Sequence, residues 1–265
     1  MASRAVSGTK DTVTESIRNG SIGARNISYP LIRGIAGRDH NCWSELDRGR
    51  AILTSIEQLD QYLFSYGPMT KGQWDQVLPS VHIPSGRVQI VDYGCGQGLA
   101  SALLFDHFGS ELVMRTTKMI LVERSRVALT RAESILRCYA PRTDVRSLYK
   151  CIDDLTVDDL RSDGENIFVH LFSNVLDMDS FDHIDLFTKI LKTKGSHTFL
   201  CVSHNRDFCG GSKRFHEIAS ILNNSPDQKK RFTMQPVALR EFRCPHKGHA
   251  SISMQLRVEV HHGSF

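Results

Sequence analysis

The segment Val91-Asp92-Tyr93-Gly94-Cys95-Gly96-Gln97-Gly98 constrains the fold more than any other part of the sequence. It ends a run of β-branched residues that starts at Val88, and it precedes an apolar helical pattern that begins near Leu99. Glycines at alternate positions permit a sharp turn with positive φ and leave no Cβ between the backbone and a ligand. The helix after the turn would direct free backbone N–H groups at that ligand. The segment therefore predicts a strand, a ligand-binding turn and a helix.

Downstream of this turn, strand and helix patterns alternate with short connections, which predicts an α/β fold with a mostly parallel, doubly wound sheet. Strands are expected at 88–92, 119–122, 145–151, 167–172 and 198–202, and helices at 99–108, 126–138, 181–191 and 213–222. Residues 251–260 alternate strictly between polar and apolar side chains. That alternation predicts a final antiparallel strand at the edge of the sheet.

Three regions are expected along the chain. The breaker Pro84-Ser85-Gly86 marks the start of the α/β domain, predicted to cover residues 85–265. Apolar residues at helical spacing predict a helical cap over residues 42–84. Residues 1–41 are rich in Ser, Arg, Gly and Asn with weak periodicity, and are expected to form a flexible arm.

The composition is that of an ordinary globular protein, with 40% apolar and 23% charged residues. The longest apolar runs fall far short of the roughly 20 residues that span a bilayer. The first 20 residues hold no apolar block of the kind found in secretion signals. Cys95 and Cys201 lie in a turn and a strand that we expect to be buried, so reduced thiols in a cytoplasmic protein are the predicted state.

The net charge of +4 is too small to imply nucleic-acid binding by itself. The segment from Lys229 to His249, however, contains six basic residues against one acid, Glu241. This local bias slightly favours an anionic substrate such as RNA or a phosphorylated metabolite. A solvated surface run explains the same pattern and is the simpler interpretation.

The glycine spacing distinguishes two kinds of nucleotide site. In a dinucleotide-binding turn the third glycine comes three residues after the second, a position that Leu99 occupies here. Asp92, Gly94, Gly96 and Gly98 instead resemble, position for position, motif I of class I S-adenosylmethionine (SAM)-dependent methyltransferases. The resemblance implies a seven-stranded sheet of the class I methyltransferase type with an N-terminal helical extension. It also implies SAM as the cofactor, with the glycine turn beneath its methionine moiety.

Further acidic residues fall where this family binds the rest of SAM. Glu123 ends an apolar strand, and the resemblance implies that its carboxylate, which only accepts hydrogen bonds, binds both ribose hydroxyls. Asp153 or Asp154 follows the next strand, where the family presents an acid to the adenine amino group. A helix N-terminus accounts for these two aspartates equally well.

The end of the fourth strand corresponds to the motif that faces the transferred methyl group in this family. Ser173 is expected to contact the cofactor, and Asn174 and Asp177 are the candidate catalytic residues there, together with His204 after the fifth strand. The Asp/Asn-Pro-Pro-aromatic tetrad of amino-directed DNA methyltransferases is missing from this segment, and the chain has no Pro-Cys pair. The sequence therefore disfavours those two DNA-methylating chemistries.

The predicted function is that of a SAM-dependent methyltransferase whose acceptor the sequence leaves open. The alternative is a non-catalytic module that keeps the fold and binds SAM or a macromolecular partner. A pocket open beside the methyl group would favour the enzyme, whereas a pocket filled by side chains would favour the module. Cys244, His246 and His249 lack paired metal-ligand spacing, so no metal site is expected.

Overall fold

The computed structural model describes residues 9–38, 40–164, 166–207, 211–224 and 232–261. Its α-helices are α1 (Thr12–Arg18), α2 (Tyr29–Ile35), α3 (Ile56–Ser65), α4 (Gly67–Val77), α5 (Leu99–Arg115), α6 (Arg126–Tyr139), α7 (His183–Ile190) and α8 (Lys213–Asn224). Its strands are β1 (Val88–Tyr93), β2 (Thr116–Glu123), β3 (Asp144–Tyr149), β4 (Ile167–Ser173), β5 (Gly195–His204), β6 (Phe232–Met234), β7 (Ala238–Arg243) and β8 (Ala250–Val260). Short 3-10 helices are η1 (His40–Gly49), η2 (Leu78–Ser80), η3 (Ile152–Asp154) and η4 (Asp158–Leu160).

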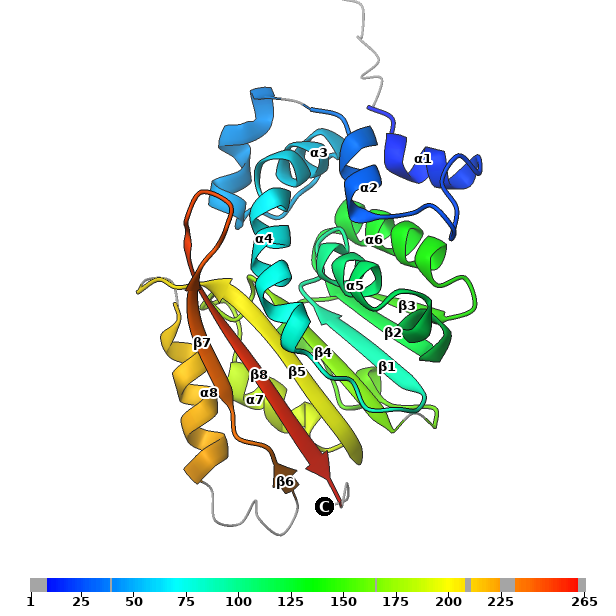
Figure 1. Cartoon of the computed structure of the whole chain (residues 1–265). Coiled ribbons are helices and arrows are strands. Elements are labelled where there is room, and N and C mark those ends of the chain that lie inside the picture. Colours follow the sequence, from blue (N-terminus) through cyan, green and yellow to red (C-terminus); the bar gives the residue numbers. More distant parts are fainter. Residues whose placement is uncertain (1–8, 39, 165, 208–210, 225–231, 262–265) are drawn as a thin grey trace, which may run out of the picture.

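The strands form one sheet in the order β3-β2-β1-β4-β5-β8-β6, with β7 also paired to β8 (Figure 1). The first five strands of this order are parallel, and β8 runs antiparallel to β5. The chain moves outward from β1 to β3, then returns to β4 on the other side of β1. The predicted α/β, doubly wound and mostly parallel sheet is confirmed, and its strand order reverses between β1 and β4.

The prediction that residues 251–260 form an edge strand is wrong. β8 is antiparallel as expected, but β7 pairs with Ala250–Gln255 and β6 with Val258–Val260 on its outer side. These two short strands together fill the seventh place in the sheet. The sequence did not reveal them because β6 has only three residues and β7 is half exposed at the edge, which leaves little apolar pattern.

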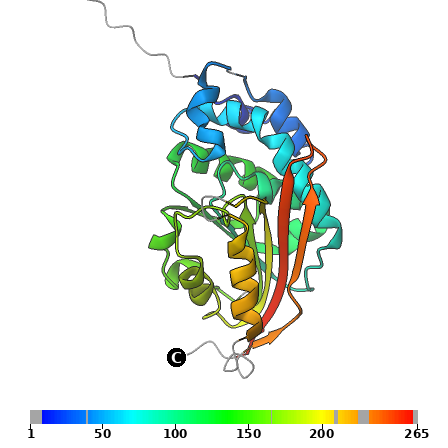
Figure 2. The same cartoon turned by 90° about the vertical axis from the view of Figure 1, so that its left-hand side faces the viewer.

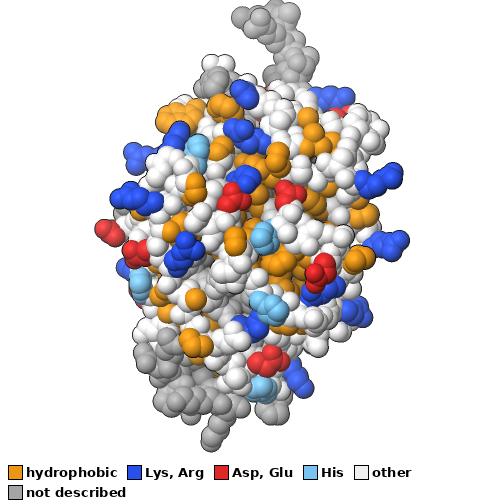
Figure 3. Space-filling view, viewed as in Figure 1, with side chains coloured by type: hydrophobic (Ala, Val, Ile, Leu, Met, Phe, Trp, Pro, Cys, Tyr) orange, Lys and Arg blue, Asp and Glu red, His pale blue; other side chains and the backbone are white. Residues whose placement is uncertain are grey.

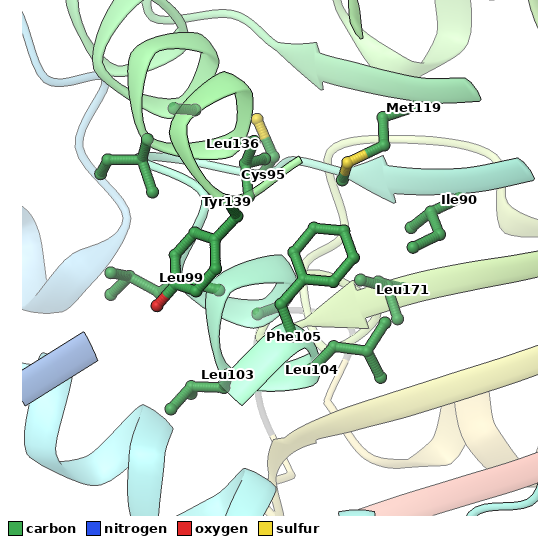
Figure 4. Close-up of a cluster of buried hydrophobic side chains, with 14 of the residues drawn as sticks. Ile90, Cys95, Leu99, Leu103, Leu104, Phe105, Met119, Leu136, Tyr139 and Leu171 are labelled. Atoms are coloured by element: carbon green, nitrogen blue, oxygen red, sulfur yellow. The ribbon is translucent and has the colours of Figure 1, made fainter. Parts of the chain in front are cut away.

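Helices cover both faces of the sheet: α4, α5 and α6 lie on one face, and α7 and α8 on the other (Figures 1 and 2). All six residues of β1 are buried, as expected for a strand covered on both sides. On the first face, Leu99 and Phe105 of α5 and Tyr139 of α6 meet Ile90 of β1 and Leu171 of β4 (Figure 4). This packing holds the helix that follows the glycine turn firmly against the sheet.

Helix α5 is longer than predicted. The helix was expected to end at residue 108, and the structure shows what the residues after it do. The helix kinks at Gly109 (φ 62°, ψ −151°) and continues to Arg115, after which β2 starts at once. The guanidinium of Arg115 donates to the backbone oxygen of Gly86, at 3.0 Å, and to that of Pro84.

Residues 1–41, which the sequence led us to expect as a flexible arm, include two helices, α1 and α2. Asp11 caps α1 by accepting hydrogen bonds from the backbone of Val13 and Thr14, and Ser28 caps α2. Val13 and Ile32 are completely buried in the main core, because these short helices place their few apolar residues on one face. The predicted helical cap therefore begins near residue 12.

A buried arginine, Arg131 of α6, joins this N-terminal region to the glycine turn. Its side chain is fully buried and forms ion pairs with Asp11 at 3.0 Å and with Asp60 of α3 at 2.7 Å. The same guanidinium donates to the side-chain oxygen of Gln97 in the turn, at 3.1 Å, while the amide nitrogen of Gln97 donates to the backbone oxygen of Leu59, at 3.0 Å. One cation thus fixes α1, α3, α6 and the turn relative to each other.

Replacing Arg131 with Met should destabilise the protein by about 3–5 kcal/mol, because the buried carboxylate of Asp60 and the partly buried one of Asp11 lose their cation. Urea unfolding at pH 7 measures this loss. Arg18→Ala is the control, since the pair of Arg18 with Glu15 is exposed to solvent and stabilises the fold little. Equal losses in the two variants would contradict the role assigned to the buried cluster.

A chain of hydrogen bonds crosses the second face of the sheet. His197 donates from Nε2 to the backbone oxygen of Thr193, at 2.9 Å, so its Nδ1 must accept when the ring is neutral. His170 then donates from Nε2 to that Nδ1, at 2.9 Å, and accepts at its own Nδ1 from the Tyr93 hydroxyl, at 3.1 Å. Burial lowers the pKa of both histidines, that of His197 to about 4. Both rings are therefore neutral, and their tautomers are fixed.

This chain predicts a loss of stability in acid. A histidine whose pKa falls from about 6.5 in the unfolded chain to about 4 stabilises the fold fully above pH 6.5, and that contribution disappears as the pH falls to 4. His197 alone accounts for up to about 3 kcal/mol. Unfolding in urea at pH 7.5 and pH 4.5 should show a smaller loss for His197→Gln than for the wild type. The exposed His107→Gln variant should follow the wild type; parallel losses in all three proteins would refute the assignment.

Candidate functional site

The glycine turn after β1 has the conformation that its sequence predicts. Gly94, Gly96 and Gly98 have φ values of 60°, 53° and 80°, which residues with a Cβ rarely adopt. A Cβ on Gly94 would lie 2.7 Å from the Val175 side chain, so this glycine permits close packing. A Cβ on Gly96 would meet no atom within 4 Å. Gly96 therefore presents bare backbone to open space.

That open space is a pocket at the carboxyl ends of β1, β2, β3 and β4. It is lined by Gly94 and Gly96 of the turn, by residues that follow β2 and β3, and by Asn174 after β4. The N-terminal cap closes another side with Leu53 and Tyr62. The pocket spans the place where the strand order reverses, which is where open α/β sheets bind their ligands.

Glu123, at the end of β2, lies in this pocket beside the turn. One carboxylate oxygen accepts from the backbone N–H of Gly96 at 2.9 Å, and the other accepts from that of Ser125 at 2.7 Å. Burial raises the pKa of this carboxyl group, and the two backbone hydrogen bonds oppose that rise. Each oxygen keeps a further lone pair, so the fixed carboxylate can still accept hydrogen bonds from a ligand.

Asp92 lies beneath the turn and does not line the pocket. It is 1% exposed, and one carboxylate oxygen accepts from the Ser101 hydroxyl at 2.7 Å. Its other oxygen is buried and has no hydrogen-bond partner among the described residues. Burial raises the pKa of Asp92 to about 7. A cofactor role for Asp92 thus remains a prediction, and it would act from behind the turn.

Asp153 and Asp154, the predicted adenine contacts, are not among the residues that line the pocket, which here are Lys150, Cys151 and Ile152. Asp153 accepts instead from the backbone N–H of Asp182, the residue that caps α7, at 2.9 Å. Both aspartates lie in η3, a single short turn. The contact with adenine remains a prediction that the position of Asp153 does not favour.

Ser173 and Asn174 do line the pocket and are fixed by α4. The Ser173 hydroxyl accepts from the indole nitrogen of Trp74 at 3.0 Å, and the amide nitrogen of Asn174 donates to the Gln73 side chain at 2.9 Å. Asn174 has a φ of 55°, and its side-chain oxygen is buried without a hydrogen-bond partner within the described part of the chain. Strained backbone and an unused acceptor in one residue are features of a binding site.

The other two candidate catalytic residues lie apart from Asn174. Asp177 is buried and forms an ion pair with Arg206 at 2.8 Å. His204 ends β5 and lines a second pocket, where its ring meets that of His249 edge to face at 6.0 Å. Burial lowers the pKa of His204, so its ring is neutral at pH 7. The three residues therefore do not share one pocket.

The second pocket lies between the N-terminal helices and the end of β5, and the turn between β7 and β8 forms its remaining side. Its aromatic and basic residues are Arg33, Trp43, Arg48, Phe64, Tyr66, His204, Arg206, His246, Lys247 and His249. Sequence reasoning missed most of these residues because they come from elements that only tertiary packing brings together. Trp43 carried a misleading signal: it fits a helical apolar pattern, yet it is 58% exposed.

The strand order, the antiparallel strand beside β5, the glycine turn after β1 and the acid at the end of β2 occur together in one known architecture. This is the class I methyltransferase fold. No protein-family model matches the sequence, and no curated protein matches it either. Among solved structures, a SAM-dependent methyltransferase from Leishmania major is 14% identical over 80% of this chain and 81% of its own, with a TM-score of 0.45.

Two other solved structures are similar at the same low level. A class I SAM-dependent methyltransferase from Listeria monocytogenes, described as putative, is 15% identical over 94% of this chain and 80% of its own, with a TM-score of 0.45. The M. jannaschii protein TYW2, solved in complex with AdoMet, is 12% identical over 71% of this chain and 76% of its own, with a TM-score of 0.43. AdoMet binding is thus a property of the M. jannaschii protein and is not shown for this chain.

Metal ligands do not gather anywhere in the described part of the chain. Throughout residues 9–38, 40–164, 166–207, 211–224 and 232–261, no cluster of three or more His, Cys, Asp or Glu side chains has the geometry to hold a metal ion. No helix within the same ranges is long and apolar enough to cross a membrane.

The buried carboxyl of Asp92 gives a prediction with a definite sign. Its pKa rises from 3.8 in the unfolded chain to about 7. The protonated carboxyl therefore contributes its full stability below pH 3.8, and this contribution is lost as the pH rises through 7. Asp92→Asn keeps an acceptor for Ser101 and removes the ionisation. Between pH 4 and pH 8, the free energy of unfolding of the variant should rise relative to that of the wild type by up to about 4 kcal/mol. Urea unfolding measures this gain. Exposed Asp144→Asn should show no such gain; if both variants behave alike, the assignment fails.

Proposed function

We propose that this chain is a SAM-dependent methyltransferase, with SAM in the pocket at the carboxyl ends of β1 to β4. The observation that carries the proposal is the open backbone of Gly96, whose N–H is bound by the carboxylate of Glu123 at 2.9 Å. A glycine that faces a pocket and an acid fixed beside it at the end of the next strand form the two sides of a cradle for a nucleoside.

The residues of the pocket fit SAM in chemistry as well as in place. The Glu123 carboxylate has lone pairs left for the two ribose hydroxyls. Val122, Ile152 and Phe181 offer apolar surface of the kind that an adenine ring requires. A side chain at position 96 would fill the space that the backbone leaves open.

SAM, when bound, supplies a methyl group on a sulfonium. The leaving group is a neutral thioether, which needs no proton. The protein must therefore orient the acceptor, exclude water and, for some acceptors, remove a proton. Tyr62 and Phe181 cover the pocket from the cap and from the segment after β4. Asn174 lines the pocket, and its buried side-chain oxygen has no hydrogen-bond partner among the described residues. His204, neutral at pH 7, is the candidate base on the acceptor side.

The alternative of a non-catalytic module has less support. A module of that kind would tolerate a methyl-donor pocket filled by side chains, whereas this pocket is open and adjoins a second one. Tyr62 lines the first pocket and Tyr66 the second, and their rings lie 5.1 Å apart. An acceptor in the second pocket would thus lie across these two rings from the donor, and methyl transfer would require its reactive atom to reach past them.

The anionic acceptor that the basic segment favours also stays a proposal. Residues 229–231 lie outside the described residues. Arg240 of the same segment donates to the backbone oxygen of Gln76 at 3.1 Å, and Arg243 to that of Gly248 at 3.0 Å. Lys247 and His249 line the second pocket. The segment therefore contributes to an anionic site mainly through its turn.

Gly96→Phe should abolish SAM binding without unfolding the protein, because the new ring enters the pocket. Isothermal titration with SAM and with S-adenosylhomocysteine measures the binding, and circular dichroism reports the fold. Gly20→Phe is the matched control: Gly20 also has a positive φ, 78°, and open space around its Cβ, but it follows α1 and does not line the pocket. The control should bind SAM like the wild type.

If the Gly96→Phe variant bound SAM with unchanged affinity, this pocket would not be the SAM site. If the wild type bound neither ligand, the result would favour the alternative of a non-catalytic module that does not use SAM.

A further inference from the structure

The second pocket is strongly cationic. Among the described residues that line it, four are Arg or Lys and none is Asp or Glu. One of the four, Arg206, is neutralised by the buried Asp177. The other three, Arg33, Arg48 and Lys247, come from α2, η1 and the β7–β8 turn and converge on the pocket. Basic side chains also gather at the upper left of Figure 3, over the tip of that turn and the N-terminal helices.

Two of these cationic residues have a backbone conformation that costs free energy. Arg48 has a φ of 54° and Lys247 a φ of 56°, in the left-handed region. Only four described residues other than glycine have positive φ, and three of them, counting Asn174, line one of the two pockets. Strained residues concentrate at functional sites, because the surrounding structure must maintain them. This distribution separates Arg48 and Lys247 from an ordinary solvated surface.

Arg33 adds an unused donor. Its Nε is buried and has no hydrogen-bond partner among the described residues, while its guanidinium lies over the Phe64 ring, 5.6 Å from the centroid. A buried N–H without an acceptor is uncommon and disfavours a purely structural role for the side chain. This N–H would gain an acceptor if the guanidinium turned toward an anion in the pocket.

The pocket also has aromatic surface for a planar group. Trp43 is 58% exposed, although tryptophan is highly buried on average in folded proteins. Phe64 and Tyr66 line the same pocket. Cations together with exposed aromatic faces are the combination that recognises nucleotides, through phosphate contacts and base stacking.

We propose that the second pocket binds a nucleotide unit of the methyl acceptor, with its phosphate on Arg33, Arg48 and Lys247 and its base stacked on Trp43. The term acceptor rests on the proposed methyl transfer, whereas the nucleotide site stands on the residues of this pocket alone. A free nucleotide and a nucleotide within a single strand present the same chemistry to these residues. The shared wall through Tyr62 and Tyr66 places that nucleotide beside the SAM pocket.

The test measures fluorescence anisotropy of a fluorescein-labelled single-stranded oligoribonucleotide of about 12 residues, a length within the range that single-strand sites cover, on the full chain. An unlabelled nucleoside monophosphate mixture is the competitor. The double variant Arg33→Gln/Lys247→Gly removes two cations and one strained residue. Its affinity should fall at least about tenfold, and the salt dependence should become shallower by up to about 0.7 in log–log slope, the value for the one phosphate that these residues neutralise. Trp43→Leu should weaken binding about fivefold or more, because the base has no indole to stack on.

The matched control is Arg25→Gln/Arg142→Gln, which removes the same charge from exposed positions that do not line the pocket. This control should stay within about twofold of the wild type. Tight binding of the oligonucleotide with weak competition by the monophosphates assigns the pocket to a strand, and equal competition per nucleotide assigns it to a free nucleotide. Failure of the wild type to bind either probe, or equal losses in the pocket and control variants, overturns the proposal.

Titration of the same variants with SAM separates this proposal from the preceding one. The Arg33→Gln/Lys247→Gly protein should bind SAM with unchanged affinity, because neither residue lines the SAM pocket. Normal SAM binding without pocket-dependent nucleotide binding sinks only the nucleotide site. Pocket-dependent nucleotide binding without SAM binding leaves the nucleotide site standing and sinks the methyltransferase.

Discussion

The buried guanidinium of Arg131 is the interaction on which the arrangement of the site depends. It binds Asp11 and Asp60 from the N-terminal region and Gln97 from the glycine turn, so the cap cannot shift without affecting the turn. A fully buried cation requires nearly complete pairing, since its desolvation is costly. The cap in turn supplies walls to both pockets, among them Tyr62 in the first. The N-terminal extension is thus part of the site and not an appendage.

The two pockets lie side by side, separated by the rings of Tyr62 and Tyr66. β4 and β5 are neighbours, and the backbone N–H of Asn174 donates to the oxygen of Val202 in β5, at 2.7 Å. This hydrogen bond ties the segment that lines the first pocket to β5, whose last residue lines the second. Asn174, Arg48 and Lys247 hold strained backbone on the two sides of this boundary. Binding of ligands would compensate strain that folding alone leaves in place.

The α/β core was predictable because its signals are local. Glycines at 94, 96 and 98 fix the turn, and β1 is apolar in most positions because helices cover both its faces. The second pocket was not predictable in this way. Trp43 and Lys247 lie far apart in the sequence and neither carries a motif, so only tertiary packing joins them. The adenine contact of Asp153 stays a prediction, since the structure shows only that this side chain accepts a hydrogen bond from the backbone of Asp182.

The most direct test of the account is a crystal structure of the chain with S-adenosylhomocysteine. The account predicts the ligand in the pocket at the ends of β1 to β4, with its ribose hydroxyls on the Glu123 carboxylate and its amino-acid portion over Gly96. Its sulfur should face Asn174 and the second pocket. A ligand bound elsewhere, or bound in this pocket without contact to Glu123 and Gly96, would contradict the central claim.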